Sequence, residues 1–288
     1  MMAARRAVIC MQIYQDAALI IESQQYRRDC LQLLAKKFPL IPQETLLSIY
    51  SQRYQQHTKQ VHHAHRQAMK EYYDQYQSRN ACQESSESLL LEMANEILFS
   101  PALFARMILE EHIRRNNLIP VETAASSIVS QWVKSPHLIQ DTALQHQVRQ
   151  CILTDTNYGP LGENLKHSVG HQYEFLLLEK IKELRIPYLD ERDLSSRGYD
   201  KTPDIKLEVP IAVNGHIVNW IESKASFGDE LNHNKYLDEQ FWSYTNRFGS
   251  GLVIYWFGFV QELDVHEKQG IMLTDHFPPR STITLLAN

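Results

Sequence analysis

The spacing of apolar residues divides the chain into two stretches of different character. As far as about residue 150, glycine is absent and apolar residues recur every three or four positions, which is typical of amphipathic helices. From Asn157-Tyr158-Gly159-Pro160 onward, the chain contains glycines, strand-like apolar runs and turn dipeptides. The pattern therefore predicts two domains, an all-helical region over residues 1–150 and a second domain over residues 151–288.

Two units of helix, short turn and helix are expected in the first stretch. In the first unit, a helix over residues 30–38 is followed by two prolines and then by one long helix, or two helices, over residues 43–76. In the second unit, helices over residues 89–98 and 103–113 are joined at Ser100, which is placed to cap the second helix because a proline follows it.

These units resemble helix-turn-helix modules, in which the second helix enters the major groove of DNA. A small helical bundle without DNA contacts gives the same pattern, so both interpretations stay open. Basic residues that favour DNA contact occur in this region and are interspersed with acidic ones: Arg27, Arg28, Lys36, Lys37, Arg53, Lys59, Arg66 and Lys70.

The second stretch alternates between helical and strand-like patterns. Residues 167–184 and 234–247 have helical spacing, whereas residues 204–213 and 217–225 are strand-like. The nearly unbroken apolar run GLVIYWFGFV at residues 251–260 is typical of a strand that is buried on both faces. This order of elements predicts an α/β domain with a mixed sheet.

A hairpin brings acidic residues and a lysine to one end of two strands. The dipeptide Asn214-Gly215 is a strong signal for a tight turn between the two strand-like runs. The first run begins at Asp204, and the second ends with Glu222 and Lys224. An acid and an acid-x-lysine set are therefore expected side by side, although they are far apart in sequence.

The register of this hairpin decides whether the side chains share a face. With a two-residue loop and regular pairing, Asp204 lies opposite Ala225 and faces away from the other two functional groups, because paired residues share a face. A three-residue loop would instead pair Asp204 with Lys224. A bulge at Pro210, which cannot donate to the strand ladder, would also place Asp204 on the same face of the sheet as Glu222 and Lys224. An active site at this place requires one of these two devices.

The residue types suit metal-assisted cleavage of a phosphodiester. The carboxylates of Asp204 and Glu222, with the backbone carbonyl of Ser223, offer oxygen ligands of the kind that Mg²⁺ or Mn²⁺ prefers. Such an ion offsets the charge of the transition state and lowers the pKa of bound water. Lys224 is placed to orient the attacking water or to stabilise the developing charge.

Glu174 is a further candidate ligand and accessory acid. Leu177, Leu178 and Ile181 stand three, four and seven residues beyond it on one helical face. We therefore expect Glu174 to point toward the sheet, where burial of a carboxylate is costly unless it is paired or bound to metal.

Gln240 and Tyr244 complete a recognisable pattern. Their spacing of four residues places them on one helical face after the catalytic strand, and with Asp204, Glu222 and Lys224 they give PD…ExK…QxxxY. That pattern resembles the RecB-like branch of the PD-(D/E)xK nucleases. Simple core packing of this helical pair is the alternative interpretation.

The motif Thr202-Pro203-Asp204 and its surroundings, GYDKTPDIKLEVPIAVNGHIVNWIESKASFGDE, resemble the TPD-motif family of PD-(D/E)xK nucleases. The segments LLSIYSQRYQQH and NYGPLGENLKHSVGH extend the similarity to nearly the whole chain. The resemblance implies helix-turn-helix-like modules before a restriction-endonuclease-like domain related to Holliday-junction resolvases. It also carries over Asp204, Glu222 and Lys224 as the catalytic set and Glu174 as the accessory acid.

The same resemblance implies a protein partner and a cellular setting. The partner is codanin, a large protein linked to a histone chaperone and to red-cell maturation, and the expected location is the nucleus and the cytoplasm. Nothing in the residues themselves indicates which surface would contact codanin.

Composition and charge limit the other classes of protein. A net charge of −5 gives no global basic field, so nucleic-acid binding must come from local patches. The cysteines at positions 10, 30, 82 and 151 form no CxxC pair, which argues against a structural zinc site and favours a reducing compartment. The short apolar run near the N-terminus is too brief for a signal peptide, and no stretch reaches transmembrane length.

The residues therefore predict a Mg²⁺-dependent endonuclease that acts on DNA or structured nucleic acid, and the resemblance implies that it acts with codanin in chromatin and erythroid maturation. One alternative is a nuclease fold with weak catalysis whose main role is to bind codanin. Another is a sequence-specific DNA-binding regulator that uses the N-terminal helices. DNA or RNA as substrate, and the oligomeric state, stay open.

Overall fold

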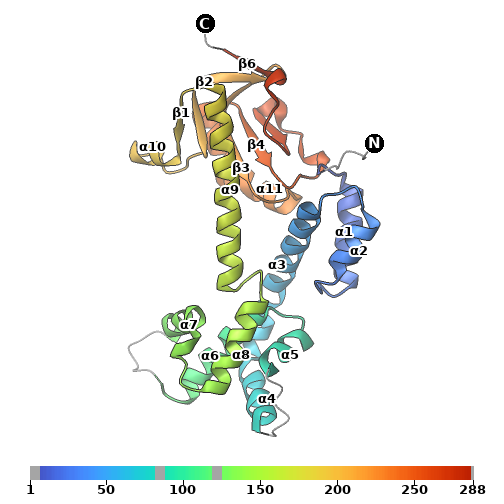
Figure 1. Ribbon diagram of the computed structural model, residues 1–288, viewed down its shortest axis with the longest axis vertical. Coiled ribbons are helices and arrows are strands. Elements are labelled where there is room, and N and C mark those ends of the chain that lie inside the picture. Colours follow the sequence, from blue (N-terminus) through green and yellow to red (C-terminus); the bar gives the residue numbers. More distant parts are fainter. Residues whose placement is uncertain (1–6, 82–87, 119–124, 287–288) are drawn as a thin grey trace. The chain divides into compact units, whose positions relative to one another are not determined.

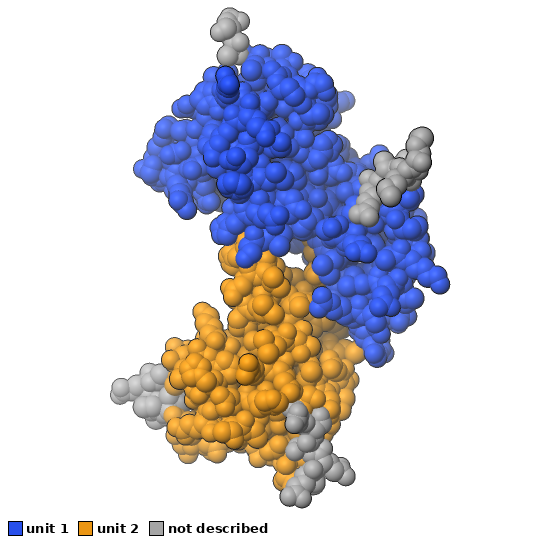
Figure 2. All heavy atoms as spheres, in the orientation of Figure 1, with its two compact units in different colours: residues 1–50, 168–288 blue, residues 51–167 orange. Residues whose placement is uncertain are grey.

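The computed structural model describes residues 7–81, 88–118 and 125–286. Contacts group the chain into two compact units, coloured separately in Figure 2: residues 1–50 with 168–288, and residues 51–167. The first 50 residues thus pack with the C-terminal part of the chain. The prediction that the chain consists of two independently folding domains with a boundary near residue 150 stays a prediction.

The unit of residues 51–167 is helical, as expected for the first stretch of the chain. Its core consists of apolar side chains from several short helices, among them Leu90, Phe104 and Val148, which are fully buried. Ser100 accepts a hydrogen bond from the Leu103 N–H at 3.1 Å and precedes a proline, so the predicted N-cap is confirmed. This unit contains the later part of α3 and the first turns of α9 (Pro160–Leu184). Its other helices among the described residues are α4 (Met69–Ala81), α5 (Leu89–Glu96), α6 (Pro101–Arg115), α7 (Ala125–Lys134), the turn Pro136–Leu138 and α8 (Thr142–Thr154).

Three further helices at the N-terminus belong to the other unit, wholly or in part: α1 (Met11–Ser23), α2 (Cys30–Lys37) and α3 (Gln43–Gln67). The expected region of residues 43–76 forms two helices, because α3 ends at Gln67 and α4 begins at Met69. The helical N-terminal region is therefore confirmed. The assignment of helix-turn-helix modules stays a prediction.

The unit of residues 1–50 and 168–288 contains a mixed six-stranded sheet, as predicted. The strand order is β1-β2-β3-β4-β5, and β6 also pairs with β2 (Figure 1). Neighbours β2 and β3 are antiparallel, whereas β3 and β5 both run parallel to β4. The strands are β1 (Tyr188–Asp190), β2 (Ile205–Val213), β3 (His216–Lys224), β4 (Gly251–Tyr255), β5 (Ile271–Thr274) and β6 (Ile283–Leu285).

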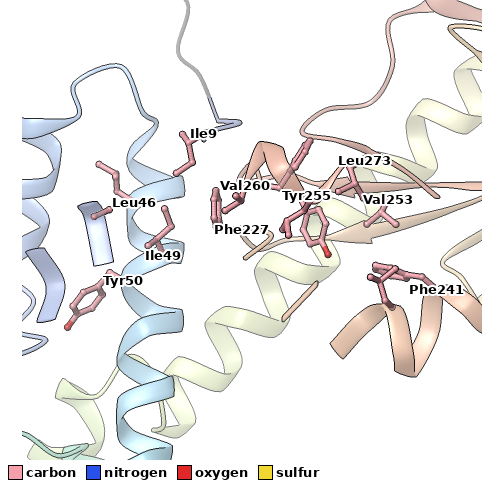
Figure 3. Packing of buried hydrophobic residues seen from close by; sticks show 14 of the residues in the cluster. Ile9, Leu46, Ile49, Tyr50, Phe227, Phe241, Val253, Tyr255, Val260 and Leu273 are labelled. Atoms are coloured by element: carbon pink, nitrogen blue, oxygen red, sulfur yellow. The ribbon is translucent and has the colours of Figure 1, made fainter. Parts of the chain in front are cut away.

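Alternation along the strands gives the sheet two different apolar faces. On β3 and β4, Trp220 and Val253 belong to one cluster, while Ile221 and Leu252 belong to another. The first cluster includes residues from α1, α2 and α3, and Figure 3 shows Phe241 packed beside the strands on this face. The second face is covered by α9 (Pro160–Leu184), through residues such as Leu177.

The chain after β3 departs from the expected single helix. It forms α11 (Glu230–Tyr236), a π-helical turn over Leu237–Phe241 and α12 (Trp242–Phe248). The remaining elements of this unit are α10 (Glu191–Ser196) and the turns Gln261–Leu263, Glu267–Gln269 and Arg280–Thr282.

The expected strand over residues 251–260 is too long. It ends at Tyr255, because Gly258 N–H donates to the Tyr255 carbonyl at 2.8 Å and the chain turns there. Gly258 has a φ of 83°, and a Cβ at that position would lie 1.8 Å from the Ala7 carbonyl oxygen. Beyond the turn, Trp256 and Phe257 are partly buried, whereas Phe259 and Val260 are buried and form isolated parallel bridges with Gly228 and Ile9.

The β2–β3 hairpin has a two-residue loop and a bulge. Val213 pairs with His216, so the alternative of a three-residue loop is wrong. The register then shifts between Lys206 and Ile211, a segment that contains Pro210. The bulge that an active site requires at this place is therefore confirmed, and it brings Asp204 beside the end of β3.

The cysteines at positions 10, 30 and 151 are free, and Cys82 lies outside the described residues, as does the start of the chain. Within the described ranges, no helix combines the length and apolar character that a membrane crossing requires.

Candidate active site

Asp204 and Glu222 are joined at the same end of β2 and β3. The backbone N–H of Asp204 donates to Glu222 Oε2 at 3.3 Å, and the backbone N–H of Ser223 donates to Asp204 Oδ2 at 2.7 Å. Glu222 is 4% exposed. Each carboxylate is therefore held by the backbone of the opposite strand, which fixes both groups with little dependence on side-chain freedom.

Lys224 connects this pair to the helical segment that follows. Its Nζ donates to Glu222 Oε1 at 2.6 Å and to Gln240 Oε1 at 2.9 Å. The lysine side chain is 14% exposed. The structure thus brings Asp204, Glu222, Lys224 and Gln240 together in one cluster of direct contacts.

Burial acts against ionisation of both acids, and repulsion by Glu222 adds to this effect at Asp204. Burial raises the pKa of Asp204 well above its usual range, and the neighbouring charge of Glu222 raises it further. Burial also raises the pKa of Glu222, even though the ammonium of Lys224 opposes this effect. The two carboxylates are therefore held close together at an electrostatic cost.

Lys224 remains a cation in this environment. Burial acts to lower the pKa of its ammonium group, but the charge of Glu222 and the hydrogen bond to it outweigh burial, so the pKa is raised. This makes Lys224 a fixed positive charge and not a neutral base. With both acids ionised, the cluster of these three residues carries one net negative charge.

The donor set of Asp204 and Glu222 fits a hard divalent cation. Both groups are oxygen donors, and a cation between them would relieve the repulsion that raises the pKa of Asp204. Among the described residues, no group of three or more His, Cys, Asp or Glu side chains is gathered so as to hold a metal ion. Asp204 and Glu222 are therefore the two acidic side chains of this site that could hold such an ion.

Glu174 does not lie where the sequence predicted. Its side chain is 49% exposed and accepts a hydrogen bond from His171 Nδ1 at 3.2 Å, so the expectation that it faces the sheet is wrong. Leu177 and Ile181 on the same helix are fully buried, but Glu174 lies about one turn earlier. Its charge nevertheless raises the pKa of Asp204, which places Glu174 at the edge of the site.

Ser223 is held on both sides by hydrogen bonds. In addition to the bond from its N–H to Asp204, its Oγ accepts from Trp256 Nε1 at 2.8 Å. The indole of Trp256 in turn packs on Tyr173 of α9, with ring centroids 5.1 Å apart. These contacts fix the backbone between Glu222 and Lys224.

Tyr244 lies in the core beside the site. It is 3% exposed, and its ring packs edge-on against Trp220 with centroids 5.3 Å apart. Burial raises the pKa of its hydroxyl, and the charges of Glu222 and Asp204 raise it further. Tyr244 thus combines the core-packing role with proximity to the acids.

One feature of the site was missed at the level of sequence. The π-turn over Leu237–Phe241 places two aromatic rings near the lysine: Lys224 Nζ lies 4.5 Å from the ring centroid of Tyr236 and 5.9 Å from that of Phe241. The segment LDEQF has no composition that distinguishes a π-turn from an α-helix. The five-residue spacing of the two aromatic residues is the signal that could have indicated it.

Comparison with known proteins places this chain among close relatives. A family described as "Protein of unknown function TPD sequence-motif" matches residues 140–277. The chain is 48% identical over 274 residues to "CDAN1-interacting nuclease 1" of Xenopus tropicalis, covering 94% of this chain and 89% of that protein. The proteins of the same name from Danio rerio and Homo sapiens are each 46% identical, over 94% and 92% of this chain and 89% and 94% of their own lengths. No solved structure matches.

Proposed function

Because this chain belongs to the family of CDAN1-interacting nuclease 1 proteins, we propose that it is a metal-dependent nuclease with Asp204, Glu222 and Lys224 as its catalytic centre. The observation that carries the proposal is the geometry of the two acids and the lysine. They meet through hydrogen bonds of 2.6 to 3.3 Å, although burial and repulsion disfavour the ionised acids. Perturbed groups of this kind are characteristic of functional sites.

Asp204 and Glu222 would hold Mg²⁺ or Mn²⁺, with the Ser223 carbonyl as a further oxygen ligand and Glu174 as an accessory acid at the edge. A bound divalent ion lowers the pKa of water and offsets the negative charge of a phosphodiester under attack. The exposure of Glu174 suits a role through water better than direct ligation.

The other residues of the site act on charge and position. Lys224 presents a fixed positive charge beside Glu222, where it orients a water molecule and stabilises the charge that develops on the phosphate. Gln240 accepts a hydrogen bond from the same ammonium and so fixes its direction. Tyr244 supports the strand beneath Glu222 through Trp220.

The fold that this function implies is of the PD-(D/E)xK, restriction-endonuclease-like type. Its support is the mixed sheet, in which an antiparallel hairpin carries the acids and a parallel neighbour, β4, is fully buried. The nucleic acid would be DNA or a structured nucleic acid. The same proposal includes contact between the nucleic acid and the helix-turn-helix-like pairs α2–α3 and α5–α6.

The partner of this chain would be codanin, because the name of its relatives indicates that interaction for those proteins. The resemblance of the sequence to the family supports a location in nucleus and cytoplasm and a part in chromatin and erythroid maturation. Co-precipitation of the tagged chain with codanin, together with imaging of the tagged chain in cells, tests both points.

A scaffold that binds codanin with weak catalysis is the second candidate, favoured by the exposed position of Glu174. Cleavage assays separate the two. Branched, flap, single-stranded and duplex substrates of DNA and RNA are incubated with Mg²⁺ or Mn²⁺ and the wild-type chain, Asp204→Asn or Lys224→Met. The matched control is Glu208→Gln, because Glu208 is an exposed acid on β2, which is one strand of the catalytic hairpin.

The nuclease proposal expects cleavage by the wild type and by Glu208→Gln, and none by the two site variants. Cleavage that survives in Asp204→Asn contradicts the site. An inactive wild type that still binds codanin favours the scaffold.

A further inference from the structure

The ammonium group of Lys224 lies in an enclosure of aromatic rings and polar oxygens. Its Nζ is 4.5 Å from the ring centroid of Tyr236 and 5.9 Å from that of Phe241, within the range of about 6 Å for a cation–π interaction. Glu222 and Gln240 accept its hydrogen bonds on other sides. Four side chains therefore restrict where this cation can point.

The enclosure depends on the π-turn that follows α11. In a regular α-helix, residues five positions apart point in directions about 140° different. In this segment the Trp242 N–H donates to the Leu237 carbonyl, five residues back, so the helix is locally widened. This brings Tyr236 and Phe241 onto one face, with ring centroids 5.9 Å apart, and both rings then reach Lys224.

The strand beside Lys224 is buried. Tyr255 is the registered neighbour of Lys224 on the parallel strand β4, and it is fully buried. Its hydroxyl lies 2.9 Å from Nδ1 of His233, which is 1% exposed. Tyr236 lies near enough to Tyr255 for its charge to affect the pKa of that hydroxyl. The lysine is thus held between a fixed strand and the π-turn.

We propose that Tyr236 is a positioning residue for the cleavage reaction, holding the Lys224 ammonium by its ring face so that the cation points at the reacting phosphate. The proposal rests on the proposed nuclease function. The ring face, and not the hydroxyl, does the positioning, because the recorded contact is from Nζ to the ring centroid. Glu222 and Gln240 hold the ammonium through two hydrogen bonds, and the ring of Tyr236 adds a further wall that limits rotation of the flexible lysine stem.

Tyr236→Phe and Tyr236→Leu separate the ring face from apolar volume. Tyr236→Phe keeps the π face and should retain kcat within about twofold of wild type. Tyr236→Leu keeps apolar packing but removes the cation–π contact, so kcat should fall roughly tenfold while KM changes by less than about twofold. Leu231→Ala, at a side chain 58% exposed on the same helix, controls for general damage to α11.

A second measurement does not depend on cleavage. The full chain is treated with an acetylating N-hydroxysuccinimide ester, and mass spectrometry follows modification of Lys224 relative to Lys235, whose side chain is 61% exposed on the same helix. Tyr236→Leu should raise the relative rate at Lys224 at least about threefold, because one wall of the enclosure is removed. Tyr236→Phe and Leu231→Ala should leave it unchanged.

The cleavage and acetylation measurements test the nuclease function and the positioning role of Tyr236 separately. A wild type that does not cleave any substrate defeats the nuclease function, and the acetylation result then decides whether Tyr236 holds Lys224. Wild-type kcat or an unchanged acetylation ratio in Tyr236→Leu overturns the positioning role. An equal loss in Tyr236→Phe and Tyr236→Leu also overturns it, because the ring face would then not be the group that acts.

Discussion

The backbone N–H of Asp204 donates to Glu222 Oε2 at 3.3 Å, across the end of the β2–β3 hairpin. The two residues are 18 positions apart in sequence, and the shift in register between Lys206 and Ile211 brings them level. Two acids are thereby fixed side by side where burial raises the pKa of both, and the charge of Glu222 raises the pKa of Asp204 further. Placing two acids together in this way lowers the free energy of unfolding but provides a site that can act chemically.

This exchange predicts opposite effects of Asp204→Asn on activity and on stability. The variant removes the repulsion with Glu222 and keeps an oxygen that can accept from the Ser223 N–H. Because the pKa of Asp204 is raised in the folded state, its ionisation destabilises the fold at neutral pH. We expect cleavage to be lost and the free energy of unfolding to rise by about 1–2 kcal/mol at pH 7.

Urea denaturation of the metal-free protein at pH 7 measures this change, with Glu208→Gln as the exposed control. The stability gain should shrink as the pH falls toward 4, because the wild-type acid then becomes neutral as well. A variant that is less stable than wild type at pH 7 would show that the hydrogen bonds of Asp204 outweigh the repulsion.

The bulge in β2 carries the second prediction. Val209 lies in the segment between Lys206 and Ile211 where the register shifts. Deletion of Val209 should turn Asp204 to the opposite face of the sheet, because each residue of slip inverts the face. Cleavage should fall below detection while the circular dichroism spectrum stays that of a folded mixed α/β protein. Val209→Ala, which keeps the count of residues, should remain active; an active deletion variant would show that the bulge is not what sets the phase.

His233 makes the stability of the fold sensitive to acid. Burial, with a smaller effect from the charge of His266, lowers its pKa to about 4. The unfolded chain binds a proton near the ordinary pKa of 6.5, so stability is lost as the pH falls from about 6.5 to about 4. This single group contributes a slope of at most about 1.4 kcal/mol per pH unit.

The matched variant is His233→Gln, which retains a polar partner for the Tyr255 hydroxyl. Its free energy of unfolding should depend less steeply on pH between 6.5 and 4 than that of the wild type. His65 and His112 also have pKa values lowered by burial, so the slope should diminish and not vanish. Identical slopes in the two proteins would mean that His233 is protonated without cost.

Much of the site could be predicted because it depends on local pattern. The turn at Asn214-Gly215 set the ends of the hairpin, and the period of two along each strand showed that regular pairing would separate Asp204 from Glu222. The sequence therefore required either a three-residue loop or a bulge at Pro210, and the structure has the bulge. The register shift extends over the whole segment from Lys206 to Ile211. This extent depends on the pairing of β2 with both β1 and β6, which cannot be read from the local sequence pattern.

The failures have tertiary causes. The helical period placed Glu174 on the same face as Leu177, but period alone does not say where the sheet stops covering the helix, and Glu174 lies beyond that point. The apolar run after Tyr255 looked like strand because core packing and strand pairing demand the same residue types. The π-turn is favoured by its contacts with Lys224, which lies in a different element.

Calorimetric titration of Mg²⁺ or Mn²⁺ into the wild-type chain and into Asp204→Asn tests the central claim most directly. We expect saturable binding to the wild type that vanishes in the variant, because the ion needs both carboxylates of the hairpin. Glu208→Gln should bind as the wild type does. Absence of binding to the wild type, with and without nucleic acid, or equal binding to Asp204→Asn, would contradict a metal-dependent active site formed by Asp204 and Glu222.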